Sequence, residues 1–153
     1  MSNNPPKTAR LAPVAQGQKT EELAHVSSFA LIKRGDNNEL LLEKKLRPEF
    51  SAGKWVLPSA IINFGEPPDA AIKRIVREQL GAEPGGVRLL DVQSWGDKHW
   101  DICFVYSVSV GDLGKLSSDI ERVEYFPREK LPLEFRSDNM EVLESYESRL
   151  MRD

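Results

Sequence analysis

The stretch SAIINFGEPPDAAIKRIVREQLGAE, residues 59–83, carries the most informative pattern of the chain. Pro67 and Pro68 suit the first positions of a helix, where a missing N–H costs nothing. Gly81 suits the position that follows the last turn of a helix, because glycine readily adopts the left-handed backbone found there. The sequence therefore predicts a helix that runs from Pro68 to Leu80.

The predicted helix has one apolar side and one charged side. Successive residues of a helix are about 100° apart, so residues three or four apart share a face. Arg74 and Glu78 are four apart on the charged side and can pair along the helix surface. The broad apolar arc contains Ala71, Ile72, Ile75, Val76, Gln79 and Leu80.

Alternating and apolar runs on both sides of this helix predict strands. Residues 25–34 and 39–46 flank the turn cluster GDNN and form a hairpin-like pair. The run 100–110 has apolar residues on both faces, which is typical of a central strand. A short strand follows at 121–127, and residues 137–150 predict a closing helix with Val142, Leu143, Tyr146 and Leu150 on one face. These elements favour a mixed sheet with helices on its faces.

Length and composition favour one domain. A chain of 153 residues can bury one core, and we expect a polar tail over residues 1–24 and a domain over 25–153. The net charge of −3 and the lack of like-charged blocks argue against a nucleic-acid or membrane binder. Cys103 is the only cysteine, which excludes an internal disulfide. The absence of a long apolar run and of a signal-like leader favours a cytoplasmic protein.

Residues 59–83 resemble the Nudix box, the signature of hydrolases that act on nucleoside diphosphates linked to another group. The matches are Glu66, Arg74, Val76, Glu78 and Gly81. Similar flanking segments extend the resemblance over about residues 25–150. It implies an α/β (α+β) fold, namely a Nudix-like α/β/α sandwich with a mixed sheet, the box helix and a C-terminal helix.

The resemblance also implies a chemistry and the residues that carry it. In the family, glutamates of the helix bind Mg²⁺ ions that bridge the diphosphate, and carboxylates help to activate water. Carried over to this sequence, the candidate catalytic residues are Glu78, Glu66 and Arg74. Glu78 and Asp97 are the candidate ligands of Mg²⁺, with Asp69, Asp101 and His99 as further groups near the same site.

The box also departs from the family pattern at the positions that matter for metal. Ser59 and Ala60 replace glycines, Ile75 replaces the glutamate after the arginine, and Gln79 replaces the last glutamate. Mg²⁺ is usually held by one or two carboxylates together with substrate phosphates and water. Glu78 alone is a weak anchor, so we expect Mg²⁺-dependent hydrolysis to be lost or much reduced.

Ligand binding has its own candidates. Lys45 and Arg47, beside or after the second strand, can supply positive charge to a phosphate, although they also suit a solvated cluster. Trp100 is the candidate for stacking on a base, although its strand position also suits the core. Trp55, Trp95, Phe104 and Tyr106 are the other aromatic residues weighed for this role.

Three functions remain open from the sequence. The first is a module that binds a nucleotide-type small molecule without hydrolysing it, which we favour. The second is an active but atypical hydrolase that recruits acids such as Asp97 or Asp101. The third is a structural or protein-interaction domain. A symmetric homodimer is the default expectation for its assembly.

Overall fold

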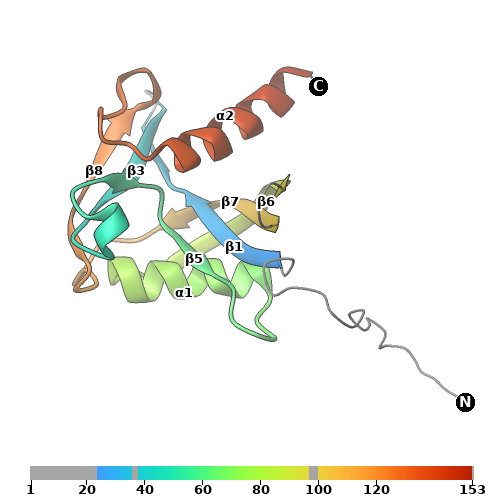
Figure 1. The fold of residues 1–153 in the computed structure, drawn as a ribbon. Helices are drawn as coiled ribbons and strands as arrows, with labels where there is room; N and C mark the ends of the chain where they lie inside the picture. The colour runs from blue at the N-terminus through green and yellow to red at the C-terminus, as the bar shows by residue number, and fades with distance from the viewer. Residues whose placement is uncertain (1–23, 36–37, 97–99, 153) are drawn as a thin grey trace, which may run out of the picture.

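The computed structural model describes residues 24–35, 38–96 and 100–152 of the chain. Its two α-helices and most of its strands are labelled in Figure 1. The elements are β1 (Ala24–Leu31), β2 (Lys33–Arg34), β3 (Glu39–Lys45), η3 (Glu49–Ser51), β4 (Trp55–Val56), β5 (Ser59–Ile61), α1 (Pro68–Leu80), β6 (Pro84–Gly96), β7 (Trp100–Val110), β8 (Ile120–Pro127), η4 (Arg128–Lys130) and α2 (Ser137–Arg152).

The strands form two four-stranded sheets. The first has the order β5-β1-β7-β6, in which β1 and β7 run parallel and the other pairs are antiparallel. In the second, β3 lies between β4 and β8, and β2 continues the hairpin with β3. The mixed sheet expected from the sequence is confirmed, and β7 is an interior strand as predicted.

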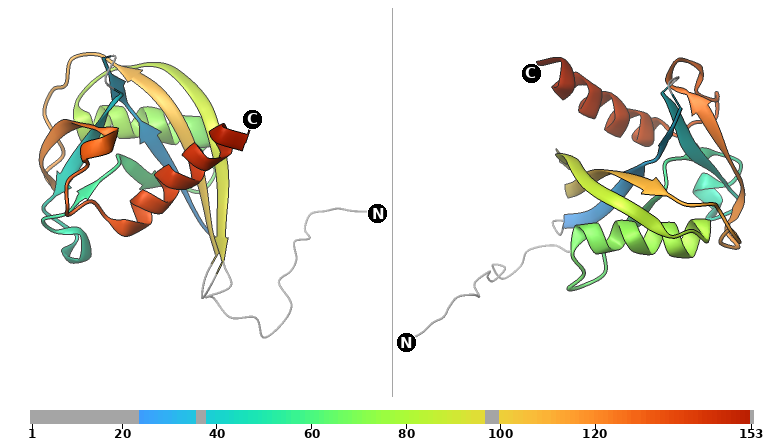
Figure 2. Two further views of the ribbon diagram at one scale, coloured as in Figure 1. Left: turned by 90° about the horizontal axis from the view of Figure 1, so that it is seen from above. Right: turned by 180° about the vertical axis from the view of Figure 1, so that it is seen from behind.

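The two helices lie on opposite sides of the strands, which gives the predicted α/β/α layers (Figure 2). Side chains alternate between the two faces of a strand. On β1 and the residue after it, Ala30 and Ile32 therefore join the core cluster under α1, while Leu31 joins the cluster under α2. On β3 the same alternation sends Leu41 toward α1 and Leu42 toward α2.

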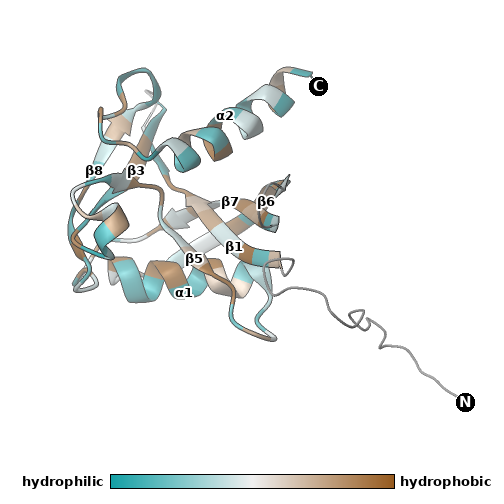
Figure 3. Cartoon of the chain, viewed as in Figure 1, coloured by the Kyte–Doolittle hydropathy of each residue, from teal (hydrophilic) through white to brown (hydrophobic). Residues whose placement is uncertain are grey.

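Both helices bury one side only, and the changes of colour around them in Figure 3 follow this pattern. The bounds of α1 agree with the predicted helix, and Gly81 follows it with a φ of 61°. The N–H of Gly81 donates to the carbonyl of Arg77 at 3.2 Å. A Cβ on Gly81 would lie 2.5 Å from the carbonyl oxygen of Lys115, so glycine is required there by both backbone angle and space.

Three sequence predictions differ from the structure or fall outside it. The first predicted strand pairs mostly with β5 and β7, and only Lys33–Arg34 forms the hairpin with β3. Leu150, predicted for the buried face of α2, is 55% exposed, because the C-terminal end of α2 extends past the strands (Figure 1). The predicted tail over residues 1–24 lies outside the described residues except for Ala24, which begins β1.

Among the described residues, no helix is both long and apolar enough to cross a membrane.

Candidate functional site

Glu66 and Arg74 hold the turn before α1 against the helix. Arg74 Nε donates to Glu66 Oε2 at 2.8 Å, and Arg74 Nη2 donates to Glu66 Oε1 at 2.9 Å. Nη2 also donates to the carbonyl of Ile61 at 3.0 Å, and the N–H of Asn63 donates to Glu66 Oε1 at 2.9 Å. The hydrogen bonds from Arg74 and Asn63 lower the pKa of Glu66 to about 2. Both charged side chains are therefore engaged in holding the turn.

Two of the three helix positions where the resemblance expects glutamate carry other residues, and their side chains face inward. Ile75 is 1% exposed and belongs to the core cluster between α1 and the strands. Gln79 Nε2 donates to the carbonyl of Ser59 at 3.0 Å, which ties β5 to α1. An isoleucine in the core cannot bind a metal, and the Oε1 of Gln79 is buried without a hydrogen-bond partner among the described residues.

Glu78 is the remaining carboxylate of the box helix. Its side chain is 69% exposed, and its Oε1 lies 4.0 Å from Arg74 Nη1. Within residues 24–35, 38–96 and 100–152, no group of three or more His, Cys, Asp or Glu side chains is arranged to hold a metal ion. The residues that the structure describes therefore do not fit the Mg²⁺ site that the resemblance implies. Asp97 and His99 lie outside the described residues.

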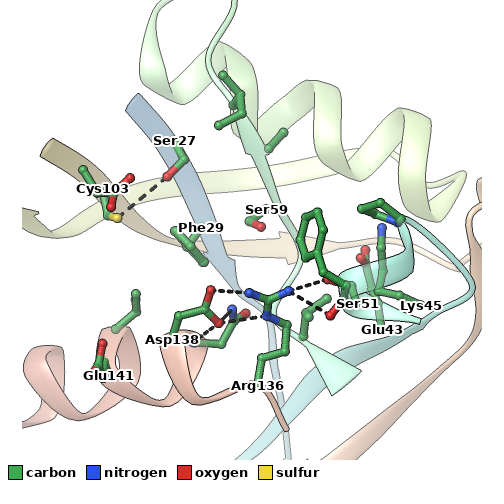
Figure 4. A pocket seen from close by; sticks show the side chains of 18 of the residues that line it. Ser27, Phe29, Glu43, Lys45, Ser51, Ser59, Cys103, Arg136, Asp138 and Glu141 are labelled. Carbon is green, nitrogen blue, oxygen red and sulfur yellow. Dashed lines mark hydrogen bonds and ion pairs between the residues drawn. The ribbon is translucent and has the colours of Figure 1, made fainter. Parts of the chain in front are cut away.

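A cleft of about 570 Å³ lies on the α2 side of this region, bordered by β1, β3, β5 and the first turns of α2 (Figure 4). Phe29, Phe50 and Trp95 give it aromatic surface, and Ser59 contributes from β5. Glu66, Arg74 and Glu78 are not among its lining residues. The box residues that match the family pattern and the cleft are thus separate features of this molecule.

Hydrogen bonds between β4 and the segment before α2 set one wall of the cleft. Trp55 exchanges backbone hydrogen bonds with this segment, accepting from the N–H of Arg136 at 3.0 Å and donating to the carbonyl of Glu134 at 3.0 Å. The N–H of Leu57 donates to Asn139 Oδ1 at 2.8 Å. Because Asn139 is buried and lines the cleft, its contact fixes the start of α2 beside β4.

Two cationic side chains line the cleft, and each has an aspartate partner. Arg136 donates to both carboxylate oxygens of Asp138, at 3.0 and 2.8 Å, and to Ser51 Oγ at 2.6 Å. Burial raises the pKa of Asp138, but hydrogen bonds from Arg136 and Asn139 outweigh it and lower that pKa overall. Lys45 Nζ donates to Asp119 Oδ2 at 2.5 Å. The cleft therefore offers guanidinium and ammonium groups, both already partly neutralised.

Glu43 is a buried acid in the same cleft. It lies in the middle of β3, opposite Val56 of β4 and Val123 of β8, and is 1% exposed. Its Oε2 has no hydrogen-bond partner within the described residues. Burial between these apolar neighbours raises the pKa of Glu43 to about 8, against the opposing field of Lys45 and with a smaller contribution from Asp119. At neutral pH its side chain is therefore mostly a neutral carboxylic acid.

The predicted ligand-binding residues take different places. Lys45 lines the cleft. Arg47 instead donates from Nη2 to both the carbonyl and the Oγ of Ser118, each at 3.1 Å. Trp100 is 48% exposed and does not line the cleft, and its Nε1 donates to Ser94 Oγ at 2.7 Å. The roles assigned to these residues stay predictions.

Sequence reasoning missed Glu43, Arg136 and Asn139. A signal for Glu43 was present, because this acid shares the strand parity of the inward-facing Leu41 in the run ELLLEKK. No comparable signal marked Arg136 or Asn139. Their role depends on contacts with residues more than eighty positions away, Ser51 and Leu57, which the local pattern does not reveal.

A family model described as NUDIX domain matches residues 24–146. Among curated proteins, the chain is 29% identical over 116 residues to an ADP-ribose pyrophosphatase of Methanocaldococcus jannaschii, with 72% of this chain and 66% of that protein covered. It is 27% identical over 107 residues to the NAD-capped RNA hydrolase NudC of Pseudomonas aeruginosa, covering 69% of this chain and 37% of that protein. The match thus spans less than two thirds of each relative.

Solved structures show the same fold. A MutT NUDIX hydrolase from Burkholderia pseudomallei superposes with a TM-score of 0.69 at 26% identity, over 80% of this chain and 98% of that one. The NUDIX domain of Shewanella oneidensis NrtR, solved in complex with ADP ribose, superposes with a TM-score of 0.64 at 18% identity over 91% and 94% of the two chains. The second likeness concerns the fold alone.

Proposed function

This chain belongs to the Nudix family, and we propose that it binds a nucleoside-diphosphate-type ligand in its cleft while Mg²⁺-dependent pyrophosphohydrolase activity is lost or much reduced. The observation that carries the proposal is the burial of Ile75 at a helix position where the family pattern has glutamate. A hydrocarbon side chain in the core can neither bind metal nor activate water. Gln79 supports the same conclusion, because its side chain is neutral and supplies no carboxylate, and its Nε2 donates to the carbonyl of Ser59.

Loss of hydrolysis follows from the number of carboxylates. Cleavage of a diphosphate needs charge neutralisation on the bridging and leaving oxygens and an activated water molecule. Glu78 is exposed and Glu66 is engaged by Arg74, so neither adds to a cluster of ligands in the described part of the chain. The described residues therefore supply no carboxylate cluster for a metal-dependent cleavage step.

Ligand binding is supported by what lines the cleft. A volume of about 570 Å³ is within the usual range for small-molecule sites. Phe29, Phe50 and Trp95 provide surfaces on which a base can stack, and Lys45 and Arg136 provide positive charge for phosphates. Because both cations have aspartate partners, we expect moderate affinity that falls with added salt.

The names of the relatives suggest the first ligands to test. One is an ADP-ribose pyrophosphatase and another is an NAD-capped RNA hydrolase, so ADP-ribose and NAD head the panel. UDP-glucose and ATP represent nucleotide sugars and nucleoside triphosphates. Each is added to the purified protein with Mg²⁺ or Mn²⁺ while the melting temperature and the products are measured.

A pair of tryptophan substitutions shows whether binding uses the cleft. Ser27→Trp places a large side chain among the lining residues, whereas Ser148→Trp places the same side chain on an exposed position of α2. We expect a ligand-induced rise in melting temperature in the wild type and in Ser148→Trp, and a much smaller rise in Ser27→Trp. No rise with any ligand in the wild type would refute the binding proposal. Turnover abolished by Glu78→Gln would instead support an atypical hydrolase.

We further propose a cytoplasmic location and a symmetric homodimer. Light scattering coupled to size-exclusion chromatography measures the mass of the assembly. A mass of one chain over the micromolar range would refute the dimer. The location is tested by expressing the full chain with a fluorescent tag.

A further inference from the structure

Glu43 is a polar group that the fold buries without giving one of its oxygens a partner. It lies on the central strand β3 of its sheet, with Val56 and Val123 opposite it on the two neighbouring strands. A buried carboxyl oxygen that lacks a hydrogen bond costs on the order of 1–3 kcal/mol, so such groups are rare in folded proteins and call for an explanation. Replacement by an apolar residue would remove this cost.

The position of Glu43 relative to the cleft offers the explanation. Glu43 is among the lining residues, and Figure 4 shows its side chain next to that of Lys45 at the β3 end of the cleft. Lys45 Nζ is bound to Asp119 rather than to Glu43. A ligand that fills the cleft can therefore reach an acid for which the described protein provides no partner at Oε2.

We propose that Glu43 is a ligand-recognition residue, which pairs as a neutral carboxylic acid with the edge of a planar nitrogen heterocycle or carboxamide that carries a hydrogen-bond donor beside an acceptor. The inference rests on the proposed function, because it identifies which part of the nucleotide-type ligand enters this end of the cleft. A phosphate oxygen would satisfy only the O–H donor of the neutral carboxyl and would leave its acceptor oxygen without a partner, so a donor–acceptor edge is the better match.

The protonation state of Glu43 decides which partner fits. A protonated carboxyl offers one O–H donor and one C=O acceptor side by side. Adenine and carboxamide edges present the complementary pair, so two parallel hydrogen bonds form at once. The raised pKa of Glu43, about 8, keeps this form populated at neutral pH.

The other groups of the cleft agree with a planar partner. Phe29, Phe50 and Trp95 line the same cleft and give it aromatic surface for a planar ring. The fields of Lys45 and Asp119 act on Glu43 directly. The remaining titratable side chains of the lining are Asp101, Cys103, Arg136, Asp138 and Glu141.

The test uses a matched pair of probes without phosphate. Adenosine has the donor–acceptor edge, whereas purine riboside has the same rings and sugar but lacks the amino donor. Neither probe changes charge between about pH 7 and about pH 9. Dissociation constants are measured by ligand-observed NMR for the wild type and three variants: Glu43→Gln, Glu43→Met and, as a control on the exposed part of β8, Glu124→Gln.

Each variant isolates one property of the carboxylic acid. Glutamine keeps a donor beside an acceptor and does not titrate, so Glu43→Gln should bind adenosine equally well at both pH values. Methionine fills the space without hydrogen bonds, so Glu43→Met should bind about tenfold more weakly, as expected for a lost hydrogen bond in a buried site. The wild type and Glu124→Gln should bind about tenfold more weakly at about pH 9 than at about pH 7, since Glu43 is then mostly ionised.

The outcomes separate this inference from the proposed function. Equal affinity of the wild type and Glu43→Met for adenosine, or equal affinity of the wild type for adenosine and purine riboside, would overturn the role of Glu43. ADP-ribose is titrated in parallel. If ADP-ribose binds the wild type and Glu43→Met equally well, the proposed function stands and the inference about Glu43 fails. If neither ADP-ribose nor adenosine binds the wild type, both are refuted.

Discussion

Arg74 and Glu66 form a two-point ion pair, with the guanidinium donating to both carboxylate oxygens at 2.8 and 2.9 Å. The pair joins the second turn of α1 to Glu66, the residue that precedes Pro67, and Arg74 also donates to the carbonyl of Ile61. Two residues that the motif places among the candidate catalytic groups therefore have a structural role here.

The first prediction concerns this ion pair. Glu66→Gln should lower the free energy of unfolding by about 1–2 kcal/mol at neutral pH, because the guanidinium of Arg74 then donates to one neutral amide oxygen and its second hydrogen bond to residue 66 is lost. The ionised form of Glu66 is favoured in the folded state, since its pKa is lowered to about 2. Its stabilisation is therefore present above the unfolded pKa and disappears as the pH falls toward about 2. Urea unfolding at a series of pH values measures this difference.

Glu78→Gln serves as the control for that experiment. Its carboxylate is 69% exposed and 4.0 Å from Arg74, so its loss should change stability by less than about 0.5 kcal/mol. Equal effects of the two substitutions would mean that the Glu66 pair does not hold the turn.

The second prediction concerns the core position in the box. Ile75→Glu should destabilise the fold by about 3 kcal/mol or more, because Ile75 is 1% exposed and a carboxylate there would be buried without a partner. Ile75→Val, which shortens the side chain by one carbon, should cost about 1 kcal/mol. Chemical denaturation of both variants gives the comparison. If Ile75→Glu were as stable as Ile75→Val, position 75 would have to contact solvent, and a metal-binding role for this position would again be possible.

The third prediction concerns Mg²⁺. Since Glu78 stands without a cluster of carboxylates in the described part of the chain, the free protein should bind Mg²⁺ with a dissociation constant above about 1 mM. Isothermal titration should show no saturable heat below that concentration. A sub-millimolar site that vanishes in Glu78→Gln would contradict the prediction.

The fourth prediction concerns the pH dependence of stability that Glu43 imposes. Folding raises its pKa from 4.5 to about 8, so between these values the folded state holds a proton that the unfolded state has released. The contribution of Glu43 to the free energy of unfolding is complete below the unfolded pKa. Between the unfolded and the folded pKa, this contribution falls by about 1.4 kcal/mol for each unit of pH. Glu43→Gln removes this titration.

The measurement is the difference in unfolding free energy between Glu43→Gln and the wild type from about pH 5 to about pH 8. As the pH rises, Glu43→Gln should become more stable relative to the wild type. Glu124→Gln, which changes the same side chain at an exposed position, should show no such growth. A constant difference for Glu43→Gln would mean that Glu43 ionises normally in the fold.

The sequence was sufficient for the box helix because its signals are local. Prolines at its start, the glycine after its end and the apolar arc between them predicted α1 from Pro68 to Leu80, as observed. The spacing of Glu66, Arg74 and Gly81 then indicated the family, and with it the layers of the fold. The partner of β1 was not predictable in this way, because its parallel pairing with β7 joins residues far apart in the chain.

The cleft was harder to predict from the sequence than the helix. Arg136 and Asn139 reach it only because backbone contacts to Trp55 and Leu57 draw the start of α2 against β4. Ile75 is buried in the core, and the expectation that positions 75 and 79 do not bind metal stays a prediction. Lys45 and Trp95 line the cleft and Trp100 does not, and the ligand-binding roles assigned to Lys45 and Trp100 stay predictions.

The most direct test of the central claim follows ADP-ribose by ³¹P NMR in the presence of the purified protein and excess Mg²⁺. Binding without hydrolysis predicts that both diphosphate resonances shift or broaden as protein is added, that Ser27→Trp reduces the change, and that no phosphomonoester signal appears during prolonged incubation. The appearance of phosphomonoester products at a rate proportional to the wild-type protein, and its loss in Glu78→Gln, would show that the chain is an active hydrolase and contradict the account.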